Sequence, residues 1–260
     1  MDFVNRIYYN DRRQEMIKVG FYQELSKYYD CIFPLNSMQI EFIQERIGAK
    51  RTQILDIAAG TGNHTVVLAK LGHSLTAVEL DATMVEKIHK KKQNLDIEVF
   101  QEDMRNIDQL PNGQFDAVLC LGNSIVHLDS LHEIHNMIKK AYEQLNEQGV
   151  MIIQTVNYDR IYNDNIKELP IIENEDEGVT FIRTYEFIDD NKINFHGKLV
   201  VRNGNENETY YNTVSLYPLK SEELIEVLSI CGFKEVEMYG NYKGEAYSTT
   251  SPATIVVAYK

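Results

Sequence analysis

Hydrophobic positions recur along the chain in two periods, and the change between them outlines the fold. Apolar residues at helical spacing predict helices over 36–48, 63–71, 82–92 and 130–146. Between these segments lie short apolar runs that predict strands, namely 53–57, 73–80, 96–101, 115–121 and 150–156. Strands that alternate with helices in this way are typical of βαβ units. The pattern therefore predicts an α/β fold with a Rossmann-like, doubly wound, mostly parallel sheet.

After Tyr158 the helical period is lost. Three segments alternate in side-chain character, as expected of an antiparallel meander, namely 179–188, 192–202 and 208–217. A helix over 221–231, with Ser221 as its N-cap, and strands over 234–240 and 253–259 return to the earlier pattern. The first residues are amphipathic and helical in character, and they are rich in tyrosine. We expect three parts: an N-terminal helical cap (1–35), a core domain (36–158 with 219–260) and an antiparallel insertion (159–218).

Composition narrows the classes of function. The 260 residues include 26 Lys and Arg against 39 Asp and Glu, which gives a formal net charge of −13. Because nucleic-acid binding needs a basic surface, DNA and RNA are not expected partners. No apolar stretch reaches the roughly 20 residues of a membrane span, and charges interrupt the first thirty residues, so we expect a cytoplasmic protein. The three widely spaced cysteines predict neither a disulfide framework nor a structural zinc site.

Candidate chemistry is concentrated after the first three strands. Asp56-Ile-Ala-Ala-Gly60-Thr-Gly62 forms a strand–turn–helix junction whose glycines allow the backbone to approach a ligand closely. Glu79 ends the second strand, where a carboxylate can accept both hydroxyls of a ribose. Asp103 and Met104 follow the third strand, where they can bracket an adenine. The spacing therefore predicts a nucleoside-containing cofactor.

A nicotinamide cofactor fits this sequence less well. The dinucleotide fingerprint needs Gly or Ala three residues after the second glycine, and Thr65 stands there. The second mononucleotide-binding half is also missing after the fifth strand. A metal site is not expected either, because the histidines near residues 127–135 fall on a helix that would be partly exposed.

The same residues resemble those of class I S-adenosylmethionine-dependent methyltransferases, and the resemblance covers nearly the whole chain. The nearest type is glycine N-methyltransferase. Its segment after the fourth strand is very similar to Leu-Cys-Leu-Gly-Asn-Ser-Ile-Val-His-Leu at 119–128. Asn-Tyr-Asp at 157–159 and Ser-Leu-Tyr-Pro at 215–218 also match. The resemblance implies a methyltransferase that uses S-adenosylmethionine and leaves S-adenosylhomocysteine.

The resemblance also implies roles for individual residues. Those that would hold the cofactor are Asp56, Ala58, Gly60, Thr61, Gly62, Glu79, Leu80, Met84, Asp103, Met104 and the carbonyl of Leu121. Those that would face the methyl acceptor are Asn123, Ser124 and His127. Tyr158 and Tyr217 are added on separate grounds, because these two junctions of the insertion should lie over the carboxyl edge of the sheet. An N-terminal tyrosine would close over the cofactor, and Tyr22, Tyr28 and Tyr29 are the candidates. The insertion would then act as a lid on the acceptor.

One departure from the family bears on the substrate. The glycine enzymes have an Arg just before Asn-Tyr-Asp that clamps the substrate carboxylate, and this chain has Val156 there. We therefore expect a small-molecule acceptor other than glycine. The sequence shows no evident His/Asp dyad or metal site, which favours nitrogen as the atom that is methylated, by in-line displacement. Two alternatives stay open. One is an O-methyltransferase with His127 as base, and the other is a non-catalytic methyltransferase-like partner subunit. A homodimer through an exposed sheet edge is a further open expectation.

Overall fold

The computed structural model describes residues 20–111, 113–204 and 206–260. Its larger sheet has seven strands in the order β10-β11-β5-β4-β1-β2-β3. The strands are β1 (Gln53–Ile57), β2 (Ser74–Glu79), β3 (Ile97–Gln101), β4 (Phe115–Cys120), β5 (Leu145–Val156), β10 (Glu235–Tyr239) and β11 (Ala253–Tyr259). The pairs among β1 to β5 are parallel, whereas β11 is antiparallel to both of its neighbours. This mostly parallel sheet is the one that the sequence pattern predicts.

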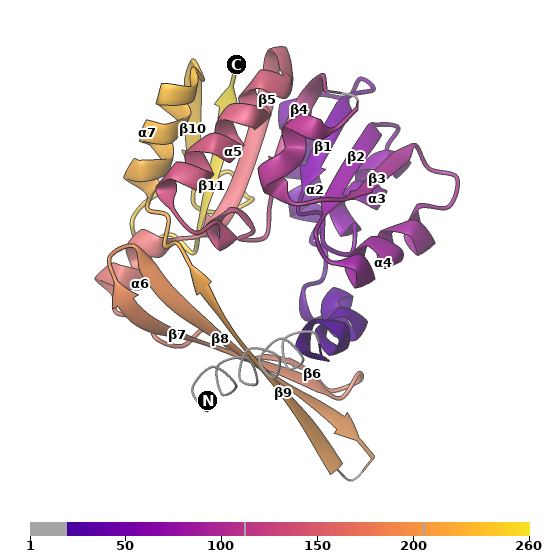
Figure 1. The fold of residues 1–260 in the computed structure, drawn as a ribbon, viewed down its shortest axis with the longest axis vertical. Helices are drawn as coiled ribbons and strands as arrows, with labels where there is room; N and C mark the ends of the chain where they lie inside the picture. Colours follow the sequence, from indigo (N-terminus) through magenta and orange to yellow (C-terminus); the bar gives the residue numbers. More distant parts are fainter. Residues whose placement is uncertain (1–19, 112, 205) are drawn as a thin grey trace, which may run out of the picture.

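Helices cover both faces of the larger sheet, as their apolar stripes require (Figure 1). These helices are α2 (Ser37–Ile47), α3 (Asn63–Lys70), α4 (Ala82–Lys92), α5 (Leu131–Gln144) and α7 (Ser221–Cys231). The short helix α6 (Tyr158–Asn163) lies instead at the end of β5, and η1 (Met104–Gln109) and η2 (Ile125–His127) are short 3-10 turns. One apolar cluster joins Ile134 and Leu224 to one face of the sheet. A second cluster joins Phe42 and Leu68 to the other face. The buried strands between the two clusters explain the continuous apolar runs in the sequence.

A second, antiparallel sheet leaves the chain after β5 and returns before α7. Its order is β6-β7-β8-β9, with β6 (Ile172–Asn174), β7 (Val179–Asp189), β8 (Lys192–Asn203) and β9 (Glu206–Leu216). Figure 1 shows that this sheet extends from the end of the larger sheet at which β5 runs into α6. The N-terminal helix, described over 20–32, packs against it through Phe21 and Leu25. Both the sheet and this helix therefore lie on the carboxyl side of the parallel strands.

Three details differ from the sequence prediction. The insertion holds a fourth strand, β6, and the short helix α6, whose few residues give too weak a periodic signal. Strand β5 begins at Leu145 rather than at 150, because a register irregularity lets it pair with the start of β4. The N-cap of α7 is Lys220, not Ser221, and the Glu223 side chain accepts the backbone N–H of Lys220 at 3.0 Å. Tertiary contact decides this start, because the N–H of Ser221 donates to Asp159 instead.

Candidate functional site

The glycine turn between β1 and α3 lies beside the point where the strand order reverses. Strand β1 is flanked by β2 on one side and by β4 on the other, which is where open α/β sheets bind ligands. Ala58, Gly60 and Gly62 all have positive φ, at 56°, 58° and 77°. A Cβ on Gly62 would lie 3.0 Å from Cγ1 of Ile88, so both this close contact with α4 and the positive φ favour glycine here. The strained turn brings backbone N–H groups to the carboxyl edge of the sheet.

A buried carboxylate, Asp56, and a half-buried one, Glu79, lie at this turn. Asp56 is 3% exposed, and its Oδ2 accepts the Thr65 hydroxyl at 2.5 Å. Glu79 accepts the backbone N–H of Gly60 at 2.8 Å and that of Asp81 at 2.9 Å. Burial raises the pKa of Asp56 from 3.8 to about 6, and burial also raises the pKa of Glu79. Among the described residues neither carboxylate forms an ion pair, so the turn presents negative charge that a cationic ligand would neutralise.

The N-terminal helix covers the turn. The Tyr29 hydroxyl lies 3.5 Å from where a Cβ of Gly60 would be, and burial together with Glu79 raises the pKa of Tyr29 to about 12. On the next residue, Asp30 accepts the Thr61 hydroxyl at 2.5 Å and pairs with Lys91 at 2.7 Å. Asp30 also accepts the Asn63 amide at 3.0 Å. These contacts fasten the helix to the turn and to α4.

The other two candidate tyrosines lie further from Gly60. Burial raises the pKa of Tyr22, a hydrogen bond with Asn212 opposes this, and the charges of Asp81 and Glu79 raise the pKa further. Tyr28 lies near Lys27 and near Tyr210, which is in the first half of β9. Of the three candidates, Tyr29 is therefore the one that the structure places against the glycine turn.

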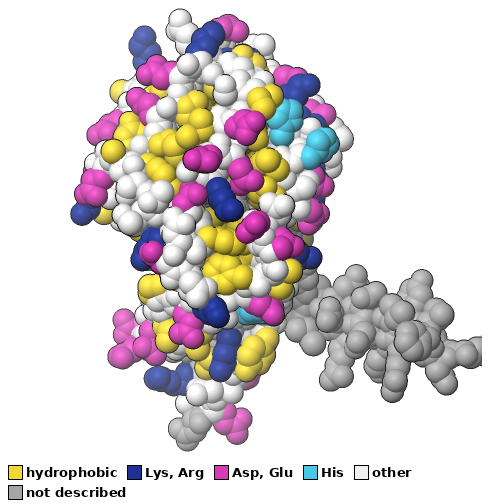
Figure 2. All heavy atoms as spheres, turned by 90° about the vertical axis from the view of Figure 1, so that its left-hand side faces the viewer, with side chains coloured by type: hydrophobic (Ala, Val, Ile, Leu, Met, Phe, Trp, Pro, Cys, Tyr) yellow, Lys and Arg dark blue, Asp and Glu magenta, His cyan; other side chains and the backbone are white. Residues whose placement is uncertain are grey.

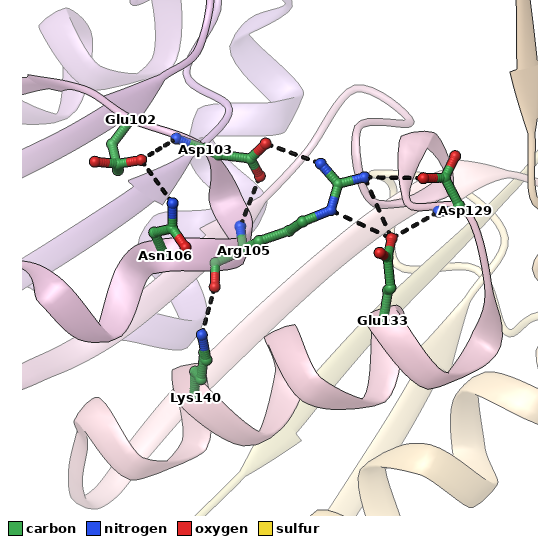
Figure 3. Close-up of polar contacts among 7 residues, drawn as sticks. All are labelled: Glu102, Asp103, Arg105, Asn106, Asp129, Glu133 and Lys140. Atoms are coloured by element: carbon green, nitrogen blue, oxygen red, sulfur yellow. Dashed lines mark hydrogen bonds and ion pairs between the residues drawn. The ribbon is translucent and has the colours of Figure 1, made fainter.

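Asp103 belongs to a charged network that joins η1 to α5 (Figure 3). It caps η1 by accepting the backbone N–H of Arg105 at 2.8 Å, and its second oxygen accepts the Arg105 guanidinium at 2.8 Å. The same guanidinium reaches Asp129 and Glu133, each at 3.2 Å. Met104 begins η1 and packs against the core cluster on the α5 face. The network therefore fixes the orientation of Asp103 at the end of β3.

Leu80 and Met84, the two predicted apolar residues that follow β2, differ in how exposed they are. Leu80 is 62% exposed and follows Glu79 directly, while Met84 is 5% exposed on the first turn of α4. The Leu80 carbonyl accepts the Gln101 amide at 3.4 Å, which ties the ends of β2 and β3 together. Leu80 is thus an apolar side chain left open beside the glycine turn, whereas Met84 contributes to packing.

The segment after β4 places Asn123 at the centre of the carboxyl edge. Asn123 has a φ of 69°, its side-chain oxygen accepts the Val156 N–H at 3.0 Å, and its amide donates to the Tyr158 hydroxyl at 3.1 Å. The Ser124 hydroxyl donates to the Leu121 carbonyl at 2.8 Å, so that carbonyl already has one partner. The geometry makes Asn123 the link between β4, β5 and the entry to the insertion.

The remaining acceptor candidates lie at different depths. Tyr158 is fully buried, and its ring centroid is 6.4 Å from that of Tyr185 in β7. Tyr217 is 7% exposed, and its hydroxyl donates to Glu223 at 2.6 Å rather than standing free. His127 is exposed at the end of η2. The structure therefore brings Asn123 and Tyr158 into direct contact, while Tyr217 is anchored to α7.

Two residues of this region were not foreseen from the sequence. Asp30 shares its helix with the charged residues Glu24 and Lys27, and nothing in its local pattern marks it as a partner of Thr61. Arg105 stands two residues after Asp103, and this spacing, in which an aspartate caps its own helix and pairs with the next cation, is the signal that could have found it.

Neither a cluster of metal ligands nor a membrane-spanning helix occurs among the described residues. Within 20–111, 113–204 and 206–260, no group of three His, Cys, Asp or Glu side chains is placed to hold a metal ion. No helix of these residues is long and apolar enough to cross a membrane. Figure 2 shows acidic and basic side chains interspersed over the described part of the face on the α7 side, in keeping with the acidic composition.

Comparison with known proteins agrees with this geometry. Residues 54–149 match the methyltransferase domain family. The chain is 29% identical over 204 residues to a glycine/sarcosine N-methyltransferase of Halorhodospira halochloris. The aligned region covers 78% of this chain and 73% of the relative.

Solved structures extend the comparison to the fold. An S-adenosylmethionine-dependent methyltransferase from Clostridium acetobutylicum superposes with a TM-score of 0.76 at 19% identity, over 92% of this chain and 98% of that one. A sugar N-methyltransferase from Streptoalloteichus has a TM-score of 0.65 at 20% identity, over 86% of this chain and 84% of its own. These similarities confirm the predicted Rossmann-like α/β fold.

Proposed function

We propose that this chain, an S-adenosylmethionine-dependent methyltransferase as its domain match and relatives confirm, methylates the nitrogen of a small polar molecule. The observation that carries the proposal is the pair of carboxylates at a strained glycine turn, the buried Asp56 and the half-buried Glu79. They lack a cationic partner among the described residues.

The residues of the turn fit this cofactor in charge and shape. S-adenosylmethionine carries an ammonium and a sulfonium, and when bound it supplies a methyl group that needs no further activation. Asp56 would hold its methionine end together with the backbone of Ala58 to Gly62. Glu79 would accept from the ribose, because each of its oxygens keeps a lone pair beyond the backbone N–H that it accepts. Asp103 and Met104 would flank the adenine.

The protein's own contribution is to position the acceptor and to exclude water. Tyr29, held by the neighbouring Asp30, closes the turn, and the sheet β6–β9 stands beside Asn123 and Tyr158. Holding donor and acceptor in line at contact distance can supply roughly 7–11 kcal/mol of the barrier. An amine arrives with its own lone pair once it is neutral, so this arrangement needs no dedicated base. The relative named as a glycine/sarcosine N-methyltransferase supports nitrogen as the acceptor atom, as does the structural neighbour named as a sugar N-methyltransferase.

Calorimetry with S-adenosylmethionine and S-adenosylhomocysteine tests the cofactor. We expect both to bind, and Glu79→Ala to weaken binding by roughly 10- to 150-fold, since a hydrogen bond to a charged acceptor contributes about 1.5–3 kcal/mol. Glu86→Ala is the matched control, because Glu86 is an exposed carboxylate of α4. The absence of binding of either compound to the wild-type protein would refute the cofactor assignment.

Product analysis tests the acceptor atom. The enzyme and cofactor would be incubated with libraries of amines and of phenols, and the products identified by mass spectrometry. Methylated amines, formed equally well by His127→Asn, are the expected result. Methylated phenols whose formation stops in His127→Asn would indicate the O-methyltransferase instead.

A further inference from the structure

The inner face of the antiparallel sheet carries one polar row between two apolar rows. Arg183 pairs with Gly197, and Gly197 pairs with Asn212 on the next strand. On either side, the cross-strand rows are Phe181-Leu199-Tyr210 and Tyr185-Phe195-Val214. Because side chains in a strand alternate between faces, all three rows point the same way.

The two apolar rows pack against different parts of the molecule. Phe181 and Leu199 join Phe21 and Leu25 of the N-terminal helix. Tyr185 joins the core cluster on the α5 side of the larger sheet, which also holds Tyr158. The N-terminal helix covers the rest of the polar row, because a Cβ on Gly197 would lie 3.1 Å from Cζ of Phe21 and Asn212 hydrogen-bonds to Tyr22. Arg183 is therefore the member of the row that lies beside Tyr185, toward the carboxyl edge of the larger sheet where the acceptor must reach the cofactor.

Arg183 has a guanidinium without an anion in this position. Its Nη2 donates to the Pro170 carbonyl at 2.8 Å, but its Nε is buried and has no hydrogen-bond partner. It forms no ion pair with any residue of the described ranges. Partial burial lowers its pKa, in keeping with a charge that lacks compensation. A buried donor of this kind is costly unless a ligand satisfies it.

A short path of contacts connects Arg183 to Asn123. The Asn123 amide meets the Tyr158 hydroxyl at 3.1 Å, and the Tyr158 ring packs on Tyr185 at 6.4 Å between centroids. Arg183 stands two residues from Tyr185 on the same face, roughly 7 Å along the strand. Arg183 is thus connected to Asn123 through two intervening side chains, whereas the Val156 N–H bonds to Asn123 directly.

We propose that Arg183 binds an anionic group of the methyl acceptor, several bonds away from the nitrogen that is methylated. This inference rests on the proposed function and names its substrate class: an amine that also carries a carboxylate or a phosphate. The planar guanidinium offers paired donors that match either anion. It takes over carboxylate recognition from the position that Val156 occupies, and it favours acceptors longer than glycine.

The test compares ω-amino acids of increasing chain length with alkylamines of equal length, and aminoalkyl phosphates with both. Turnover would be followed as S-adenosylhomocysteine formed, in wild type, Arg183→Met, Arg183→Lys and the exposed control Arg202→Met. We expect wild type and Arg202→Met to prefer the anionic amines by roughly tenfold or more in kcat/KM. Arg183→Met should lose that preference, and Arg183→Lys should keep part of it. The relative rates of carboxylates and phosphates identify which anion the site takes.

A binding measurement keeps the proposal testable without turnover. Each amino acid and phosphate would be titrated by calorimetry into the complex of the protein with S-adenosylhomocysteine. Binding that Arg183→Met weakens by tenfold or more, with S-adenosylhomocysteine affinity unchanged, supports the assignment. If the complex binds none of these anions, or binds them equally well in Arg183→Met, the assignment to Arg183 is wrong while the proposed function stands. If the wild-type protein does not bind S-adenosylhomocysteine at all, the proposed function is wrong instead.

Discussion

Asn123 and Tyr158 are joined through their side chains: the amide of Asn123 donates to the Tyr158 hydroxyl at 3.1 Å. The oxygen of the same amide accepts the Val156 N–H at 3.0 Å, so Asn123 bridges the ends of β4 and β5 to the start of α6. Since Tyr158 also packs on Tyr185, this contact links the carboxyl edge of the larger sheet to the antiparallel sheet.

Tyr158→Phe should therefore impair acceptor use more than cofactor binding. The variant keeps the buried ring and removes only the hydroxyl, whereas Tyr158→Ala would leave a cavity costing about 3–5 kcal/mol. We expect kcat/KM for the acceptor to fall by roughly tenfold and the Kd of S-adenosylhomocysteine to change less than twofold. Steady-state kinetics and calorimetry measure the two. Equal losses in both would mean that Tyr158 serves folding rather than the acceptor.

Tyr217→Phe offers a comparison at the other end of the insertion. It removes the hydrogen bond to Glu223, which anchors the returning strand to α7. If the insertion acts as an acceptor lid, this variant should also lower acceptor kcat/KM while leaving cofactor affinity intact. Unchanged kinetics would restrict the lid function to the Tyr158 end.

The raised pKa of Asp56 predicts that cofactor affinity depends on pH. Burial raises this pKa to about 6, so the free protein holds the carboxyl protonated below that value. A cationic ligand binds the ionised form, and affinity should therefore rise with pH, by at most about tenfold per unit, and level off above pH 6. Calorimetry across pH 5 to 8 would show the trend, and Asp56→Asn should flatten it. A slope that survives in Asp56→Asn would assign the titration to another group.

The raised pKa of Asp56 also predicts how the stability of the ligand-free protein depends on pH. An acid whose folded pKa exceeds its unfolded value adds stability only at low pH, and this contribution is lost as the pH rises through about 6. Asp56→Asn keeps an oxygen for the Thr65 hydroxyl and removes the buried charge. It should raise the free energy of unfolding at pH 8 by roughly 2–3 kcal/mol. Denaturant titration at pH 8 without ligand checks this, and a destabilised variant would contradict it.

Because Val156 is apolar, we expect glycine to be a poor substrate. An apolar side chain offers no donors to a carboxylate at this position, where the glycine enzymes carry Arg. We expect kcat/KM for glycine to lie at least tenfold below that of the preferred acceptor, and Val156→Arg to raise it. Efficient turnover of micromolar glycine by the wild-type protein would overturn this reasoning.

We expect the contacts of Asp30 to slow the dissociation of the cofactor product. The contacts with Thr61, Asn63 and Lys91 hold the N-terminal helix, and with it Tyr29, over the glycine turn. Asp30→Ala should speed dissociation of S-adenosylhomocysteine by several-fold in stopped-flow displacement, with a smaller change in association. Glu41→Ala, at an exposed carboxylate of α2, provides the control. An unchanged dissociation rate would show that the helix does not restrict release.

The sequence by itself determined those features that are local. The alternation of apolar runs and helical stripes placed the parallel core, and the spacing of Asp56, Gly60 and Gly62 marked the strand–turn–helix junction. These signals survive because each comes from a few neighbouring residues, and because the positive φ and the close contact with α4 favour glycine at Gly62. The exits of the second and third strands, with Glu79 and Asp103, follow from the same local pattern.

The tertiary structure alone decided which distant residues meet. Asp30 and Thr61 lie 31 positions apart, and neither carries a local sign of the other. The register of β7 with β8 and β9 puts Arg183, Gly197 and Asn212 in one row, and a shift by a single residue would turn Arg183 to the opposite face. Contacts between segments far apart in the chain depend on packing and register, which no single stretch of sequence encodes.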